Sequence, residues 1–167
     1  MRIKGIHHVT VAVRDVEAAR ATFEALLDAA AGDAASVPLF GVRTRDLTIG
    51  AAMLQLASPL DAENPVTRFL ERKGEGFYNL ALEVDDLDAI VADLTERGIR
   101  ISTPVEATPG LRSSFITMSA THGLSVQLVE VVDATRADDK PDVGEPLEVS
   151  QAEQPLDLTP DEWSDVE

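Results

Sequence analysis

The sequence predicts an α+β fold built from two paired βαβββ modules. The main observation is a repeated unit, in which a strand, a helix and three further strands follow one another twice. The strand-like segments IHHVTVAV and FYNLALEV each lead into an aspartate, and these aspartates, Asp15 and Asp86, are 71 residues apart. Both stand where the N-cap of a helix belongs. A duplication explains such a repeat better than chance does.

Length and charge fit one domain with an acidic extension. The 167 residues suffice to bury a core. We expect a domain over residues 1–132, with modules at about residues 3–58 and 76–131, and an extension over residues 133–167. The net charge is −16, and most of it lies in that extension. This disfavours nucleic acid and anionic membranes as partners, and no apolar run is long enough to span a membrane.

The absence of cysteine narrows the chemistry. No residue of the 167 is a cysteine, which excludes disulfides, thiolate metal ligands and cysteine nucleophiles and fits a cytoplasmic protein. The opening segment MRIKGIHHVTVAV lacks the small-residue cleavage site of a signal peptide. We therefore expect it to form the first strand.

The first module begins with this strand, in which apolar and polar side chains alternate. The helix after Asp15 has its apolar residues at helical spacing. Its predicted buried face consists of Val16, Ala19, Phe23 and Leu26. Strand-like runs then cover residues 36–42, 45–49 and 51–58.

The second module repeats this order after a turn at the GEG of residues 74–76. The predicted buried face of its helix consists of Leu87, Ile90, Val91 and Leu94, with Gly98 as the stop. Strand-like runs cover residues 100–102, 113–119 and 124–131. The segment ATPGLR, residues 107–112, is expected to be a loop able to gate a cavity.

Strand alternation predicts a polar cavity between the modules. The helices must cover the apolar face of each strand, so the opposite face of the first strand carries His8 and that of its twin carries Asn79. In the closing strands, Gln55 and Gln127 share that face and are 72 residues apart. The expected ligand-binding set is His8, Gln55, Asn79, Gln127, Phe77 and Met53, with Arg112 as a candidate for holding an anionic group.

These segments resemble the vicinal oxygen chelate superfamily of glyoxalases, bleomycin-resistance proteins and dioxygenases, and within it the methylmalonyl-CoA epimerases. The resemblance covers residues 3–131 and rests on IHHVTVAVRD, on LQLASPLDAENPVTRFLERKGEGFYNLALEVDD and on THGLSVQLVE. It implies the paired-module fold, a homodimer as in many relatives, and a small carboxylated or acyl-CoA-like ligand.

The resemblance also implies a divalent-metal site, from which this sequence departs. The first metal-binding histidine and the glutamine of the epimerases correspond to His8 and Gln55. The second histidine falls on Asn79 and the glutamate on Gln127, and a further catalytic glutamate falls at about Thr44. Gln127 and Thr44 cannot titrate in the useful range, so the two-base epimerase mechanism is not expected.

Two interpretations of the four polar residues stay open. A metal held by His8, Gln55, Asn79 and Gln127 is less favoured, because one imidazole and three amides supply no charge compensation. No cofactor is favoured, and the alternative is a polar cavity floor that hydrogen-bonds an organic ligand. His8 is the one member able to act as a general base near neutral pH, which makes it the candidate catalytic residue.

Three functions follow as hypotheses. The first is an isomerase or lyase, divergent from the epimerases, with His8 as its proton-transfer group. The second is a non-catalytic protein that binds and sequesters a small molecule. The third is an accessory subunit that docks through its acidic extension, where TPDEW predicts a short capped helix from Thr159 that presents Trp163.

Overall fold

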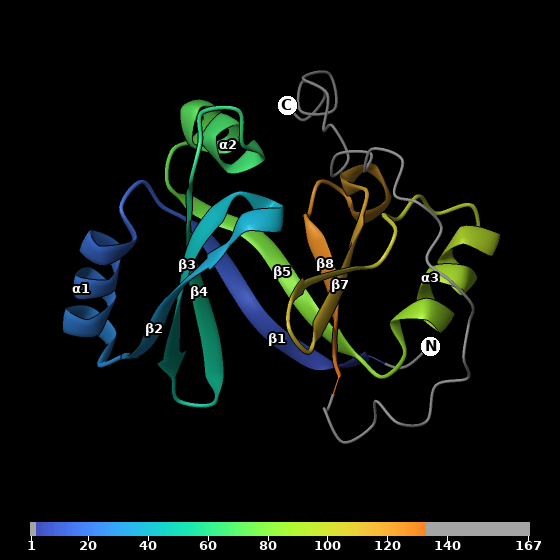
Figure 1. Ribbon diagram of the computed structural model, residues 1–167, viewed down its shortest axis with the longest axis horizontal. Helices are drawn as coiled ribbons and strands as arrows, with labels where there is room; N and C mark the ends of the chain where they lie inside the picture. Colours follow the sequence, from blue (N-terminus) through green and yellow to red (C-terminus); the bar gives the residue numbers. More distant parts are fainter. Residues whose placement is uncertain (1–2, 133–167) are drawn as a thin grey trace.

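The computed structural model describes residues 3–132 (Figure 1). The elements, in chain order, are β1 (Ile3–Ala12), α1 (Val16–Leu27), β2 (Ala30–Val37), the 3-10 turn η1 (Pro38–Phe40), β3 (Val42–Ile49), β4 (Ala52–Pro59), α2 (Pro65–Lys73), β5 (Gly76–Val84), α3 (Leu87–Glu96), β6 (Val105–Thr108), β7 (Leu111–Ile116), the 3-10 turn η2 (Met118–Thr121) and β8 (Val126–Val131). The predicted α+β fold of two βαβββ modules is confirmed. The expected acidic extension, with its short helix, lies outside the described residues.

One eight-stranded sheet contains both modules. Its strand order is β2-β3-β4-β1-β5-β8-β7-β6. Inside each module the first strand pairs in parallel with the last, β1 with β4 and β5 with β8. The two first strands, β1 and β5, pair antiparallel and join the modules. Figure 1 shows these two strands crossing the middle of the molecule, with α1 and α3 at opposite ends.

The helices α1 and α3 begin directly after the aspartates that were predicted to cap them. The Asp15 carboxylate accepts hydrogen bonds from the backbone N–H of Glu17 at 2.9 Å and of Ala18 at 3.1 Å. The Asp86 carboxylate accepts one from the N–H of Ala89 at 2.9 Å. These bonds satisfy backbone donors that a helix leaves unpaired in its first turn. Both caps are therefore confirmed.

Each module buries one apolar cluster between its helix and its half of the sheet. Under α1 the buried members are Val13, Val16, Ala29, Leu47 and Leu56. Under α3 they are Val84, Leu87, Ile90, Leu94, Val126 and Leu128. Leu26 was expected on the buried face of α1, but it is 73% exposed. It stands in the last turn of the helix, beyond the residues that reach the cluster.

The helix α2 was not predicted from the sequence. The side-chain oxygen of Asn64 caps it by accepting from the N–H of Val66 at 2.8 Å, and its Nδ2 donates to the carbonyls of Phe40 at 2.7 Å and Gly41 at 2.9 Å. Asn64 followed by Pro65 is the sequence signal for such a start. A third apolar cluster connects α2 with the central strands, and its buried members are Ala12, Val37, Val42, Val66 and Leu70.

Three predicted segments need correction. The second strand is β2, over residues 30–37 and not 36–42, because Pro38 opens a 3-10 turn there. The strand expected at residues 100–102 lies further along the chain, as β6. Residues 107–112 are not a gating loop, because Thr108 pairs with Leu111 and closes a tight hairpin between β6 and β7.

The cluster under α1 generates a prediction. Leu56 is fully buried and Leu26 is 73% exposed, so Leu56→Ala should lower the free energy of unfolding by about 3 kcal/mol. The matched control Leu26→Ala should change it by less than about 0.5 kcal/mol. Urea unfolding followed by circular dichroism measures both, and equal effects would contradict the assignment of the core.

Candidate functional site

The sheet face opposite to α1 and α3 carries a buried group of polar side chains. His8 and Thr10 come from β1, Asn79 from β5 and Gln127 from β8. His8 is 3%, Asn79 is 4% and Gln127 is 7% exposed. Polar groups are rarely buried this far without a reason, because their burial costs free energy unless hydrogen bonds compensate.

The strand register places these side chains in adjacent rows. Thr10 pairs with Gln55 on one side and with Asn79 on the other. His8 pairs with Ala81, which pairs in turn with Gln127. The structure therefore brings together the four predicted polar residues from the two modules. Met53 lies on the same face of β4, two residues before Gln55.

The hydrogen bonds of this group leave several atoms without a partner. Asn79 Nδ2 donates to Gln127 Oε1 at 3.1 Å, and Gln55 Nε2 donates to Asp46 Oδ1 at 3.0 Å. Four buried atoms on this face have no hydrogen-bond partner among the described residues: His8 Nε2, Thr10 Oγ1, Asn79 Oδ1 and Ser113 Oγ. They include hydroxyl donors as well as acceptors, so this face has unused hydrogen-bonding capacity of both kinds.

His8 is neutral over the physiological pH range. Burial lowers the pKa of its imidazole from 6.5 to about 4, and the neighbouring His7 acts in the same direction. The charge of Asp46 opposes this shift but does not overcome it. The ring thus offers a neutral nitrogen to the buried face.

Asp46 is a carboxylate that the sequence interpretation missed. It lies on β3 directly across from Gln55 of β4 and two residues beyond Thr44, on the same face. A strand boundary had been expected between residues 42 and 45, which hid this alternation. β3 runs unbroken from Val42 to Ile49, and an unbroken alternation would have placed Asp46 beside the site.

Two predicted residues do not join the group. Phe77 pairs with Val11 across a register shift in the β1–β5 ladder and is 48% exposed. Val11 packs against the cluster under α1, so the irregularity turns Phe77 away from Asn79.

Arg112 lies on the opposite face of β7. Its guanidinium donates to both carboxylate oxygens of Asp88 at 2.9 and 2.7 Å and to Glu130 at 2.9 Å. Asp88 belongs to the first turn of α3. Arg112 therefore ties this helix to the outer face of the sheet and does not face the polar group.

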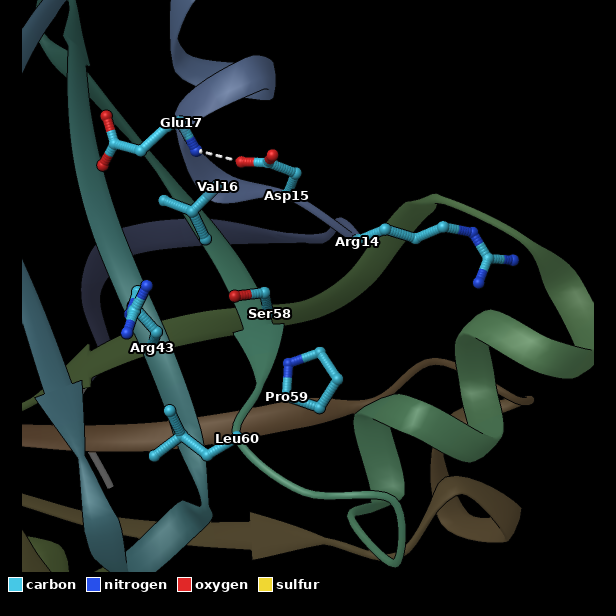
Figure 2. A pocket seen from close by; sticks show the side chains of 8 residues that line it. All are labelled: Arg14, Asp15, Val16, Glu17, Arg43, Ser58, Pro59 and Leu60. Carbon is cyan, nitrogen blue, oxygen red and sulfur yellow. Dashed lines mark hydrogen bonds between the residues drawn. The ribbon is translucent and has the colours of Figure 1, made fainter.

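A separate groove opens at the start of α1 (Figure 2). Its volume is about 360 Å³, and it is lined by Arg14, Asp15, Val16, Glu17, Arg43, Ser58, Pro59 and Leu60. Arg43 and Ser58 are cross-strand neighbours on the helix side of β3 and β4. The groove thus lies on the other side of the sheet from His8.

The polar group does not fit a divalent cation as it is arranged. In residues 3–132 no cluster of three or more histidine, aspartate or glutamate side chains is in place to hold a metal ion. The oxygen of Gln127 already accepts from Asn79, and the four predicted ligands carry no charge. Hard cations prefer several oxygen ligands with carboxylates among them.

The chain matches a known protein superfamily over most of its described residues. Residues 7–117 match the model of the Glyoxalase/Bleomycin resistance protein/Dioxygenase superfamily. The paired modules and the polar inner face agree with this match. The chain belongs to that superfamily.

Within the superfamily, similar proteins are methylmalonyl-CoA epimerases. The bovine mitochondrial enzyme is 36% identical over 97 residues, which is 58% of this chain and 55% of the bovine protein. The human enzyme is 33% identical over 96 residues, 57% of this chain and 54% of the human protein. The chain thus spans about half the length of the curated relatives it matches.

Solved structures agree with this similarity. The Mycobacterium tuberculosis methylmalonyl-CoA epimerase has a TM-score of 0.76 and 29% identity, covering 81% of this chain and 93% of the other. A variant of the Streptomyces coelicolor epimerase in complex with 2-nitronate-propionyl-CoA has a TM-score of 0.74 and 26% identity, covering 79% and 100%. In the described part of the chain, no helix has the length and apolar character to cross a membrane.

The lowered pKa of His8 generates a prediction. Between pH 6.5 and about 4 the unfolded chain binds a proton that the folded chain does not. The free energy of unfolding should therefore decrease as the pH is lowered through this window. The His8 imidazole should account for up to about 3 kcal/mol of this decrease. His8→Asn removes this contribution, so its unfolding free energy should depend less on pH.

Urea unfolding at pH 7.5 and pH 4.5 measures the difference between the two proteins. The carboxylates are the same in both proteins, so their effect on the free energy of unfolding cancels when the two proteins are compared. The control His122→Asn replaces a histidine with φ of 55° by a residue that tolerates this conformation, and it shows how much of any change comes from losing a histidine outside the buried group. Equal pH dependence in His8→Asn and wild type would refute the assignment.

Proposed function

We propose that the chain is a proton-transfer enzyme of the isomerase type that acts on an acyl-CoA or a related small carboxylated thioester. The observation that carries the proposal is the buried, neutral His8, whose Nε2 has no partner at the centre of the inner sheet face. The similarity to methylmalonyl-CoA epimerases supports the substrate class. The lyase chemistry inferred from the sequence has no separate support.

The proposed reaction begins at the carbon next to the thioester carbonyl. His8 Nε2 accepts the proton from this carbon. The electron pair of the C–H bond forms the carbon–carbon double bond of an enolate, and the π electrons of the carbonyl move to its oxygen. The hydroxyls of Thr10 and Ser113 are buried without partners and can donate to that oxygen or to a substrate carboxylate. Stabilising the enolate matters here, because an imidazole with a pKa of about 4 is a weak base.

The return of a proton to the other face of that carbon needs a second group. Gln127 cannot supply one, although it stands where the epimerases carry a glutamate. Asp46 lies beside the group, across from Gln55, and its charge acts on His8. We propose Asp46 in its protonated carboxyl form as this second group, in place of the glutamate that the resemblance puts at Thr44. Its O–H gives a proton to the carbon and the enolate electrons form the new C–H bond, after which solvent takes the proton held by His8 and returns one to Asp46.

A second candidate function is binding without catalysis. The observation that favours it is that Gln55, Asn79 and Gln127 are amides, which form hydrogen bonds but do not exchange protons in the useful pH range. Such a floor suits a protein that sequesters a small molecule. Binding without exchange of substrate protons distinguishes this candidate from the first.

We also propose that the protein forms a homodimer, as the resemblance implies. Ile3 and Ile6 of β1 and Phe77 of β5 are exposed apolar side chains on the two central strands, which supports burial against a second copy. Light scattering and analytical ultracentrifugation measure the oligomeric state.

Hydrogen–deuterium exchange of methylmalonyl-CoA tests the proposed enzyme. In D2O the wild-type protein should introduce deuterium at the carbon between carboxylate and thioester, as followed by mass spectrometry. His8→Asn should slow this exchange by about 100-fold or more, because it removes the proton acceptor. Asp46→Asn should leave exchange measurable but block formation of the opposite epimer.

Arg112→Gln is the matched control, because Arg112 lies on the other face of the sheet, and it should exchange at the wild-type rate. Calorimetry with the same compound completes the experiment. Tight binding with no exchange in the wild type would favour sequestration. Neither binding nor exchange would contradict the proposed substrate class.

Metal removal tests the fit of the polar group to a cation. Because the predicted ligands are neutral and partly bonded to one another, we expect dialysis against a chelator to leave both the exchange rate and the melting temperature unchanged. Added Co²⁺ should bind without the tight, one-to-one stoichiometry of a built site. Stoichiometric Co²⁺ binding that fails in His8→Asn would contradict this expectation.

A further inference from the structure

His7 and His8 are in direct contact, which a regular strand does not allow for consecutive residues. His7 Nδ1 lies 2.7 Å from His8 Nδ1. The two rings meet edge to face, with centroids 5.0 Å apart and an interplanar angle of 77°. Successive side chains of a strand point to opposite faces, so regular alternation would direct the His7 ring away from that of His8.

A β-bulge produces the contact. In the ladder with β5, Ile6 pairs with Leu82 and the next pair is His8 with Ala81, with a register shift between them. His7 is the extra residue at this shift. A bulge bends the strand and re-aims the side chain of its extra residue, and here it brings the imidazole of His7 beside that of His8.

A hydrogen bond between two Nδ1 atoms needs one proton, so one ring donates and the other accepts. If His7 donated, neutral His8 would carry its proton on Nε2, an N–H buried without an acceptor. If His8 donates, its Nε2 is a bare acceptor, and an unpaired acceptor is tolerated better than an unpaired N–H. His7 is only half-buried, so its own Nε2–H can be solvated. The second arrangement is therefore favoured.

We propose that His7 is a positioning residue that holds His8 as the Nδ1–H tautomer, with the lone pair of Nε2 directed to the buried polar face. The tautomer assignment rests on the observed contact between the Nδ1 atoms of His7 and His8. Its catalytic consequence rests on the proposed function.

The pair then acts as a base with its orienting partner. The α-carbon of the substrate loses its proton to His8 Nε2, and the electrons of the broken C–H bond form the enolate. His8 becomes an imidazolium whose Nδ1–H stays hydrogen-bonded to His7 Nδ1. Loss of the Nε2 proton restores the starting tautomer, whether the proton goes back to the carbon in the reverse step or to solvent after Asp46 has protonated the other face. His7 neither gains nor loses a proton in this step.

Long-range ¹H–¹⁵N correlation spectra of the histidine rings test the tautomer directly. The His8 signals are assigned by their loss in His8→Asn. In the wild type at pH 7.5 we expect a protonated Nδ1 and an unprotonated Nε2. A wild-type His8 with its proton on Nε2 would overturn the proposal, and this measurement needs no variant at position 7.

Two variants of similar size separate positioning from packing. His7→Leu removes the acceptor, whereas His7→Asn keeps an acceptor oxygen near the place of Nδ1. His8 should change to the Nε2–H tautomer in His7→Leu and keep the Nδ1–H tautomer in His7→Asn. His122→Asn, which replaces a histidine in a distant turn, should leave the spectrum of His8 unchanged. An unchanged His8 tautomer in a folded His7→Leu would refute the role of His7.

Deuterium exchange into methylmalonyl-CoA gives the catalytic readout. His7→Leu should lower kcat by about 100-fold, the effect of a misoriented catalytic group, with KM nearly unchanged, and His7→Asn should recover most of the rate. An unchanged kcat in His7→Leu would refute the catalytic consequence. The expected tautomer without any exchange in the wild type would refute the proposed function and leave the tautomer assignment standing.

Discussion

The antiparallel pairing of β1 with β5 is the constraint on which the rest of the structure depends. It joins two modules, each with its own helix and apolar cluster, into one eight-stranded sheet. Because α1 and α3 cover one face of this sheet, the other face of the two central strands is left for polar residues. Their parallel partners β4 and β8 flank them. The pairing thus gathers side chains that lie more than a hundred residues apart in the chain.

Register shifts in the β1–β5 ladder change which side chains lie next to each other. The shift between Ile6 and His8 makes His7 a neighbour of His8, and the shift between Thr10 and Val11 turns Phe77 outward. A regular ladder would have done neither, because alternation would have kept His7 and His8 on opposite faces. Burial then keeps the imidazole of His8 neutral. The position and the protonation state of this side chain therefore both follow from the pairing of the two central strands.

The centre of the inner face consists of amides. Asn79 and Gln127 form a hydrogen bond with each other, at the two positions where the resemblance implies metal ligands. The two amides can bond to each other because each supplies both a donor and an acceptor. The carboxylate of Asp46 stands at the edge of this floor beside Gln55. An inner face of this kind combines a neutral base with hydrogen-bond donors, which suits an organic ligand that carries oxygen atoms.

The duplicated modules, the two capped helices and the shared face of His8, Gln55, Asn79 and Gln127 could all be predicted from the sequence. These features depend on local rules of capping and alternation, which act between residues close together in the chain. Features that depend on pairing between strands could not be predicted in this way, because the partners are far apart in the chain. Arg112 contacts α3 because its side of β7 faces that helix, and Asp46 lies beside Gln55 because β3 runs unbroken along β4. The contact between His7 and His8 arises from a bulge, whose position is set by the partner strand and cannot be derived from local alternation.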